Sequence, residues 1–306
     1  MSISSPAAVS LIERFKARRP LRTGSLIVTV FGDVVVPRGG EVWLGSLIEC
    51  LSTLGVSDRL VRTAVFRLVK DGTLVNHAVG RRSYYALTDT GSGVFQAASK
   101  RIYARAPESF DGRWSLALLH RLGRAERAAV RKELRWAGYG QFGSEVLARP
   151  GDDLASARTL LANLSVAAQV PLLRCKDALD GAPLAEQADM AWDLRAIEVA
   201  YRDFLRVFEP VLLSLQADSP RSDADSFWIR TLLVHEYRRA LLRDPRLPED
   251  MLPAPWSGTT AFELARDIYW RVAHEAERYV SGLFVGRRGS LPPVAATFAE
   301  RFEGER

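Results

Sequence analysis

Residues 56–72, "VSDRLVRTAVFRLVKDG", constrain the fold most, because they specify a helix with two unlike halves. Ser57 is a favourable N-cap and Gly72 a favourable helix end. Successive side chains turn by about 100°, which places the apolar residues on one half of the circumference: Leu60, Val61, Ala64, Val65, Leu68 and Val69. The other half is cationic, with one aromatic ring among the charges. Its members are Arg59, Arg62, Thr63, Phe66, Arg67 and Lys70.

The neighbouring segments give this helix a context. Residues 42–55, "VWLGSLIECLSTLG", form a second amphipathic pattern, and Gly55 lies in the short turn between the two helices. Residues 73–88 have the composition of a β-hairpin that turns around Gly80, with Arg81 and Arg82 at its tip. Two helices and a basic hairpin in this order predict a winged helix-turn-helix that binds double-stranded DNA.

The net charge agrees with a polyanionic partner for this part of the chain. Residues 1–105 contain 15 Lys and Arg against 7 Asp and Glu, whereas residues 181–306 contain 16 against 20. Positive charge is therefore concentrated where the DNA-reading elements are predicted. The alternative to DNA binding is an interaction protein in which the basic face of this helix is only a solvated surface.

We predict an α+β chain of several domains. Residues 1–22 form an N-terminal helix or arm, residues 23–105 the winged helix-turn-helix, and residues 106–180 a ferredoxin-like α/β domain, because the pattern reads β-α-β-β-α-β. Residues 181–306 form a helical C-terminal domain, with one long helix over 260–284 and a loosely held tail after it.

Two short segments are less determined. The β-branched run 25–37, "SLIVTVFGDVVVP", favours a strand by propensity, and a buried first helix is the competing interpretation. Residues 37–43 read as a loop.

Neither a catalytic nor a metal-binding motif is evident, so we expect no enzyme, cofactor or metal. The four histidines are scattered, and Cys50 and Cys175 fit two buried thiols better than a disulfide. A nuclease-like enzyme in the central domain is the alternative, and its candidate acids are Asp111, Asp152 and Asp153. No apolar stretch approaches the roughly 18 residues of a membrane span, and no secretory signal is evident, so we expect a cytoplasmic protein without membrane contact.

Long motifs of the chain resemble the PaaX family of bacterial repressors of phenylacetate catabolism. They are "GEVWLGSLIECL", "LGVSDRLVRTAVFRLVKDGTL", "GRRSYYALTDTG", "WAGYGQFGSEVLARP" and "RRALLRDPRLPEDMLPAPWSG". The resemblance implies that residues 25–37 are helical. It also implies a central domain with the ferredoxin-like fold of a CRISPR-associated nuclease family, and a homodimeric repressor that phenylacetyl-coenzyme A releases from its operator. Phe66 departs from the small polar residue usual in the family.

Roles on DNA follow from the matched motifs. Arg62 and Thr63, in "VRTA", are the expected base readers, because Arg can pair with guanine and Thr can contact a thymine methyl. Phe66 could also pack on a thymine methyl, or could make a dimer or arm contact. The remaining residues would contact phosphate or the minor groove: Arg59, Arg67, Lys70, Arg81, Arg82, Ser83 and Tyr84.

An effector site would need cations for phosphates and an apolar pocket for a phenyl group. One stretch near the C-terminal end combines both chemistries, and a core stripe with solvated arginines would look the same. Its candidate residues are Trp228, His235, Tyr237, Arg238, Arg239, Arg243 and Trp256. Another catabolic pathway with a different effector is the alternative within the same class of regulator.

Overall fold

A computed structural model describes residues 6–18, 22–106, 109–176, 184–217 and 220–304. The chain divides into two compact units. Unit 1 comprises Met1–Ala104, Phe204–Arg238 and Ala261–Arg306, and unit 2 comprises Arg105–Asp203 and Arg239–Thr260.

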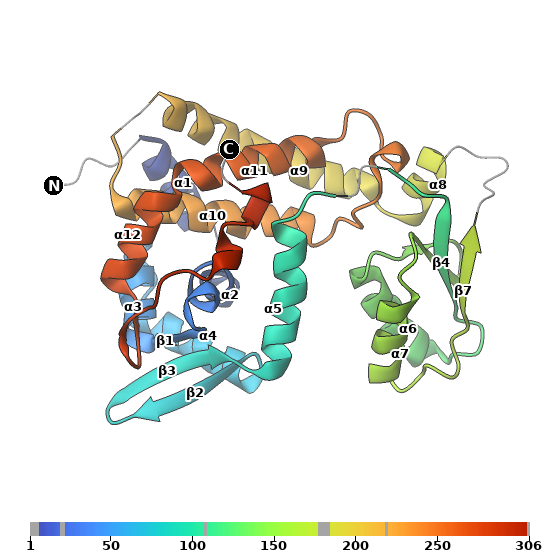
Figure 1. The fold of residues 1–306 in the computed structure, drawn as a ribbon, viewed down its shortest axis with the longest axis horizontal. Coiled ribbons are helices and arrows are strands. Elements are labelled where there is room, and N and C mark those ends of the chain that lie inside the picture. The colour runs from blue at the N-terminus through green and yellow to red at the C-terminus, as the bar shows by residue number, and fades with distance from the viewer. Residues whose placement is uncertain (1–5, 19–21, 107–108, 177–183, 218–219, 305–306) are drawn as a thin grey trace. The chain divides into compact units, whose positions relative to one another are not determined.

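The N-terminal part of unit 1 contains five helices, two short helical turns and three strands (Figure 1). They are α1 (Pro6–Lys16), α2 (Thr23–Val30), η1 (Phe31–Val35), η2 (Val36–Arg38), β1 (Glu41–Trp43), α3 (Leu44–Ser52), α4 (Asp58–Lys70), β2 (Leu74–Val79), β3 (Arg82–Leu87) and α5 (Asp89–Ile102).

The β-branched run 25–37 is helical, so the strand interpretation is wrong and the family resemblance indicated the correct structure. Helix α2 continues without a break into a π-helical turn, η1. Buried residues lie on all sides of this segment, among them Leu26, Val30 and Val35. A helix that is buried on every side belongs to the core. The burial of its side chains stabilises the helix more than the β propensity of valine and isoleucine disfavours it.

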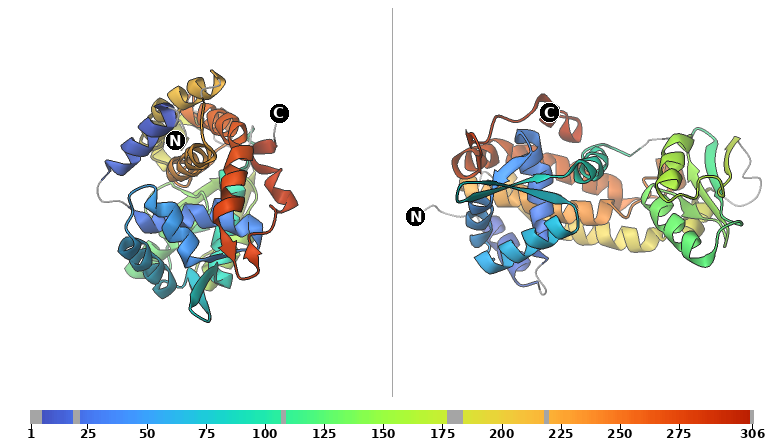
Figure 2. Two further views of the ribbon diagram at one scale, coloured as in Figure 1. Left: turned by 90° about the vertical axis from the view of Figure 1, so that its left-hand side faces the viewer. Right: turned by 90° about the horizontal axis from the view of Figure 1, so that it is seen from below.

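The hairpin β2–β3 is present with the predicted turn, and it extends from the helices as a twisted ribbon (Figures 1 and 2). The loop predicted over 37–43 is partly wrong, because β1 pairs with β3 and completes a three-stranded antiparallel sheet in the order β1-β3-β2. Three residues carry too little alternation to indicate a strand from sequence.

Unit 2 contains a four-stranded antiparallel sheet in the order β5-β6-β4-β7. Helices α6 and α7 cover one face of this sheet (Figure 2), and the core between the two layers includes Val130, Leu134, Leu147 and Leu161. The elements are β4 (Arg113–Leu118), α6 (Arg124–Trp136), β5 (Gly140–Gln141), β6 (Val146–Pro150), α7 (Leu154–Asn163) and β7 (Leu172–Lys176).

The rest of the chain is mainly helical, and the division between the units falls inside three of its helices. These elements are α8 (Leu184–Ala191), α9 (Leu194–Gln216), α10 (Asp223–Leu241), η3 (Glu249–Met251), α11 (Ser257–Arg271), α12 (Ala273–Leu283), β8 (Val285–Gly286), β9 (Gly289–Ser290), η4 (Ala296–Phe298) and η5 (Arg301–Glu303). Among the described residues, no helix combines the length and apolar character of a membrane span.

Two expectations about the C-terminal end are wrong. The predicted single helix over 260–284 is two helices, α11 and α12, which meet at Val272. The tail is not loosely held, because Phe298, Arg301 and Phe302 are buried in unit 1. The Phe302 ring lies 5.2 Å from the rings of both Tyr103 and Tyr269.

The domain boundaries remain predictions. The boundary proposed at 105/106 lies one residue from the division between Ala104 and Arg105. Residues 181–306, predicted as one helical domain, contribute to both units.

Candidate nucleic-acid interface

Helix α4 forms as its sequence predicts. The Ser57 hydroxyl accepts a hydrogen bond from the Leu60 N–H at 3.4 Å, which satisfies one free amide of the first turn. Val61, Ala64 and Val65 are buried, and α4 packs against α2 and α3. Burial of this face holds the opposite face outward.

The cationic half of α4 is open to solvent along its length. Phe66 is 68% exposed, an unusual position for a phenylalanine in a folded protein. Leu60, expected on the buried half, is 51% exposed and belongs to the open surface instead. The predicted reader residues on this exposed face are Arg59, Arg62, Thr63, Phe66, Arg67 and Lys70.

Arg62 and Thr63 each have a partner within α4. The Arg62 Nε lies 2.6 Å from Asp58 Oδ1, and both side chains are more than half exposed. The Thr63 hydroxyl donates to the Arg59 carbonyl at 2.8 Å. An exposed ion pair of this kind is worth about 1 kcal/mol at most, so the Arg62 guanidinium can exchange Asp58 for another acceptor.

The hairpin tip presents Arg81 and Arg82 to solvent. The Arg82 guanidinium lies 4.7 Å from the centre of the Trp43 ring, a cation–π geometry. Trp43 in turn lies against Gly45, where an added Cβ would be only 2.3 Å from the ring. Sequence reasoning missed this stack, because no spacing rule places Trp43 beside Arg82.

Two hairpin residues predicted to contact DNA have different environments. Tyr84 is 5% exposed and packs inward, so its ring is not available to a duplex. Ser83 is half-buried. Neighbours on a strand point to opposite faces, and the structure assigns the inward position to Tyr84.

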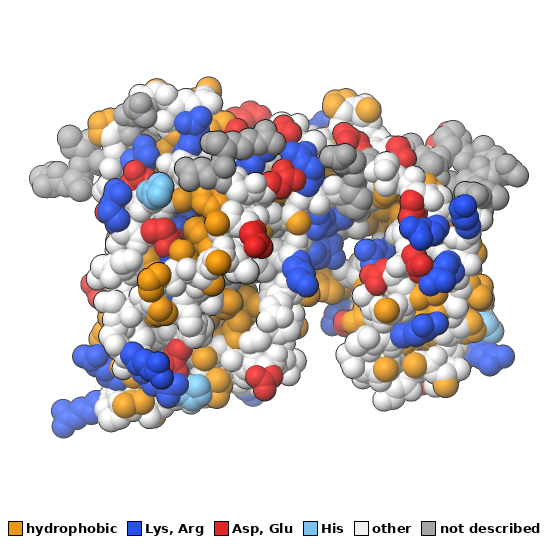
Figure 3. Space-filling model, in the orientation of Figure 1, with side chains coloured by type: hydrophobic (Ala, Val, Ile, Leu, Met, Phe, Trp, Pro, Cys, Tyr) orange, Lys and Arg blue, Asp and Glu red, His pale blue; other side chains and the backbone are white. Residues whose placement is uncertain are grey.

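A second hairpin, β8–β9, brings two further arginines near the sheet. Arg287 Nε lies 2.5 Å from Glu41 Oε2, Glu41 also contacts His77 Nδ1 at 2.8 Å, and Arg288 is exposed. Figure 3 shows Lys and Arg side chains gathered at this end of unit 1, around the tip of β2–β3. The segment "GRRGS" has no signal in the sequence that connects it with β1.

The seven residues suggested for an effector site are divided between the two units. Trp228, His235, Tyr237 and Arg238 belong to unit 1, whereas Arg239, Arg243 and Trp256 belong to unit 2. The aromatic residues are buried core: the Trp228 Nε1 donates to the Thr53 hydroxyl at 2.9 Å, and His235 Nδ1 lies 2.9 Å from the Thr29 hydroxyl.

The arginine candidates lie in different environments. Arg238 donates to the Ser25 carbonyl at 2.8 Å, and Arg239 and Arg243 are exposed. The structure shows core packing for the aromatic candidates, and the effector site suggested by these residues stays a prediction.

The acids suggested for nuclease chemistry are each held by an arginine. Asp111 pairs with Arg113 at 2.6 Å and Asp152 with Arg174 at 2.8 Å. Asp153 pairs with Arg149 and caps α7. Over the described part of the chain, no group of three or more His, Cys, Asp or Glu side chains is arranged to hold a metal ion.

The cysteines are both free, as expected, but only Cys50 is buried and Cys175 is half-buried. Burial raises the pKa of the Cys50 thiol well above its usual value, so this thiol is unreactive.

Known proteins resemble this chain over most of its length. Residues 22–91 match the PaaX-like protein family, and residues 192–282 match the PaaX-like protein C-terminal domain. The chain is 39% identical over 293 residues to the transcriptional repressor PaaX of Escherichia coli K12, covering 93% of this chain and 91% of that protein. A solved structure of an uncharacterized protein from Mycobacterium tuberculosis matches with 25% identity and a TM-score of 0.48, covering 76% of this chain and 89% of that one. The chain belongs to the PaaX family.

Proposed function

We propose that this protein is a transcriptional repressor that binds an operator through α4 and the β2–β3 hairpin. The observation that carries the proposal is the open cationic face of α4, whose opposite face is buried against α2 and α3. An α-helix fits into the major groove of B-form DNA. The name of the Escherichia coli relative supports repression.

The order of elements supports a winged helix-turn-helix. Helix α3, a turn at Gly55 and helix α4 precede the β2–β3 hairpin, and β1 completes the small sheet. In such a module the second helix lies in the major groove and the hairpin tip contacts the flanking backbone or minor groove. Arg62 and Thr63 are then the base readers, and Arg59, Arg67, Lys70, Arg81 and Arg82 the backbone contacts.

Unit 2 supports a ferredoxin-like interpretation of the central segment. Numbered along the chain, its four strands have the order 2-3-1-4 with antiparallel neighbours, and a helix follows the first and the third strand. We propose that the protein is a homodimer, because a twofold protein binds two half-sites about one helical turn apart and so gains specificity.

The proposed signal is an aryl-acetyl-coenzyme A thioester that releases the repressor from an aromatic catabolic operon. The relative's name supports repression, and the family's link to phenylacetate catabolism, implied by the sequence resemblance, supports the thioester. A ligand with this effect must bind the free protein more tightly than the DNA-bound protein, because an equilibrium shifts only by the difference in affinity.

A binding experiment at two salt concentrations tests the function. The probe is DNA from upstream of the protein's own gene and neighbouring catabolic genes, with a shuffled duplex of equal length as control. We expect specific binding that weakens with salt and is lost on addition of phenylacetyl-coenzyme A.

Each outcome has a different meaning. Equal affinity for the operator and the shuffled duplex would contradict the repressor. Specific binding that phenylacetyl-coenzyme A leaves unchanged would keep the repressor and reject this effector, in favour of a regulator of another catabolic pathway.

A further inference from the structure

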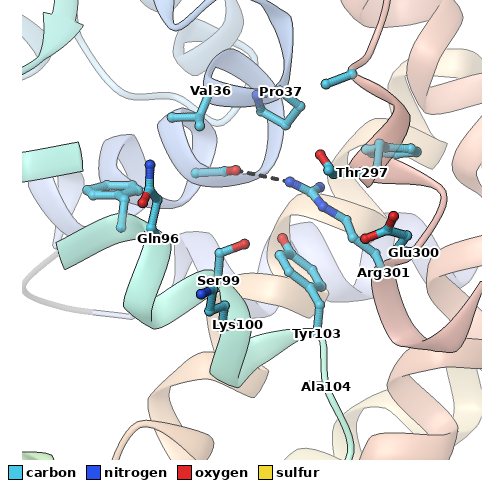
Figure 4. A pocket seen from close by; sticks show the side chains of 14 residues that line it. Val36, Pro37, Gln96, Ser99, Lys100, Tyr103, Ala104, Thr297, Glu300 and Arg301 are labelled. Atoms are coloured by element: carbon cyan, nitrogen blue, oxygen red, sulfur yellow. Dashed lines mark hydrogen bonds between the residues drawn. The ribbon is translucent and has the colours of Figure 1, made fainter. Parts of the chain in front are cut away.

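A cavity of about 600 Å³ lies in unit 1 among three segments that are far apart in sequence. Its walls come from the η1–η2 turn, from α5 and from the C-terminal segment around η4 and η5 (Figure 4). This volume is within the range of small-molecule binding sites, roughly 300–1,000 Å³.

The cavity is lined by both apolar and cationic side chains. Val36, Pro37, Phe95 and Phe298 supply apolar wall. Ser99, Lys100, Tyr103 and Arg301 supply hydroxyls and two cations, and Glu300 is the acid among the residues that line the cavity. Lys100 is exposed and forms no ion pair with the described residues. A ligand with a flat apolar body and an anionic group fits this distribution.

A buried ionic cluster lies directly behind Arg301. Asp33 is fully buried, and its carboxylate lies 2.8 Å from Arg301 Nη1 and 3.0 Å from Arg230 Nε. Glu277 pairs with Arg230 at 2.6 Å and also with Arg38. The hydroxyls of Tyr103 and Tyr269 donate to Asp33 at 2.8 and 3.0 Å.

The cluster holds more positive than negative charge. Three guanidinium groups face two carboxylates, and Arg38, Arg230 and Arg301 are all buried. Burial, together with the neighbouring Arg230, lowers the pKa of Arg38 to about 10. An anion near this cluster would offset the excess charge in a region of low dielectric constant.

Two elements that line the cavity, η1 and α5, are connected to the proposed DNA-reading elements. Turn η1 continues α2, and α2 packs against α4. Helix α5 follows β3 of the hairpin after Thr88, whose hydroxyl caps α5 and also donates to the Gly72 carbonyl at 2.6 Å. The π-helical turn η1 contains Asp33, and such turns recur at functional sites.

We propose that this cavity binds a small anion with an aryl body, and that occupancy weakens DNA binding by moving η1 and α5. The apolar group lies between Phe95 and Phe298, and the anionic group lies toward Lys100. The effect on DNA rests on the proposed function above, whereas ligand binding to the free protein does not. The aryl anion could be a free arylacetate or its coenzyme A thioester.

Four variants of the full-length chain test the site by calorimetric titration without DNA. Ser99→Trp fills the cavity, and Ala97→Trp is its control, because Ala97 is exposed on the same helix and does not line the cavity. Lys100→Ala removes the exposed cation, and Lys16→Ala, in α1, is its control. The probes are phenylacetate, phenylacetyl-coenzyme A and coenzyme A alone.

We expect wild type and both controls to bind an aryl probe with similar affinity. Ser99→Trp should lose that binding, and Lys100→Ala should weaken it about tenfold, the effect of losing one charged hydrogen bond. Preference for phenylacetate or for the thioester identifies the source of the aryl anion. The DNA affinity of both site variants should respond less to the ligand than that of wild type, each measured against the same variant without ligand.

Three results would overturn the proposal. They are wild-type affinity for the aryl probes in Ser99→Trp, no binding of either aryl probe to wild type, or coenzyme A alone binding as tightly as the thioester. If the protein binds the ligand in the cavity but does not bind operator DNA specifically, the repressor function is rejected and the ligand site is still supported. Ligand binding with unchanged operator affinity would overturn the coupling through η1 and α5.

Discussion

Arg62 lies on the exposed face of α4, where it pairs with Asp58, whose side chain is also solvent-exposed. We predict that Arg62→Ala costs about 1–3 kcal/mol of operator binding and relaxes preference at one base pair, because a bidentate contact to guanine is lost. Competition binding against operators substituted at each position measures both effects.

The matched control for this prediction is Arg67→Ala, on the same exposed face of α4. It should weaken operator and shuffled DNA by a similar factor, as expected for a phosphate contact. A uniform loss in the Arg62 variant as well would show that Arg62 reads no base.

A substitution at Gly45 tests whether the Trp43 ring positions Arg82 for DNA binding. An added Cβ would lie 2.3 Å from the Trp43 ring, so Gly45→Ala should displace the ring that holds Arg82. We expect DNA affinity to fall by about 0.5–1 kcal/mol, the value of an exposed cation–π contact. Binding isotherms at low salt measure the change.

Gly93→Ala is the control for this substitution, because Gly93 lies in helix α5 with no atom within 4 Å of an added Cβ. It should leave DNA affinity unchanged and raise the free energy of unfolding by up to about 1 kcal/mol, through helix propensity. Unchanged DNA affinity in Gly45→Ala would separate Trp43 from the function of Arg82.

At the scale of elements, the η1 turn is fixed by the charge on Asp33. Burial opposes that charge, but Arg230 and Arg301 hold the pKa of the carboxyl below its usual value of 3.8. Because the folded-state pKa is lower than the unfolded one, the stabilisation is complete above the unfolded value and is lost as the pH falls below it.

We predict that the free energy of unfolding of wild type falls below about pH 4. Asp33→Asn should cost about 3–5 kcal/mol at pH 7, because it leaves buried arginines without their counterion. Its stability should also depend less on pH in the acid range. Urea denaturation at pH 7 and at pH 3.5 measures both quantities.

Asp71→Asn, at the exposed C-cap of α4, is the control and should resemble wild type. If Asp33→Asn is too unstable to purify, urea denaturation of wild type and Arg301→Lys at the two pH values tests whether this ion pair sets the pH dependence of stability. Lysine keeps the charge of Arg301 and loses its contacts to Gly32 and Tyr269. Equal pH dependence in wild type and the Asp33 variant would contradict the assignment.

At the scale of the whole molecule, we expect the basic N-terminal third to govern DNA affinity. We predict that the logarithm of operator affinity falls linearly with the logarithm of salt concentration, because each phosphate contact releases counterions. Replacing Lys70 or Arg81 with alanine should each reduce the slope by about one. Replacing Lys16, which pairs with Glu13, should leave it unchanged. A wild-type slope near zero would contradict a phosphate interface.

Much of the candidate interface was predictable because its signals are local. The cap at Ser57, the apolar face of α4 and the turn at Gly80 each depend on residues a few positions apart, and all three are present in the structure. The exposure of Leu60 and the burial of Tyr84 were not predictable, because neighbouring elements decide which part of a face they cover.

The sequence by itself determined the family, the amphipathic helix with its cationic outer face, and the hairpin that follows it, because capping, periodicity and turn preference act within short windows. Only the tertiary structure decided that the Trp43 ring lies against Arg82 and that the C-terminal segment places Arg301 beside Asp33. Arg301 lies 268 residues from Asp33. No local pattern records such a contact, since it arises when a buried carboxylate in one segment requires a cation that the fold supplies from another.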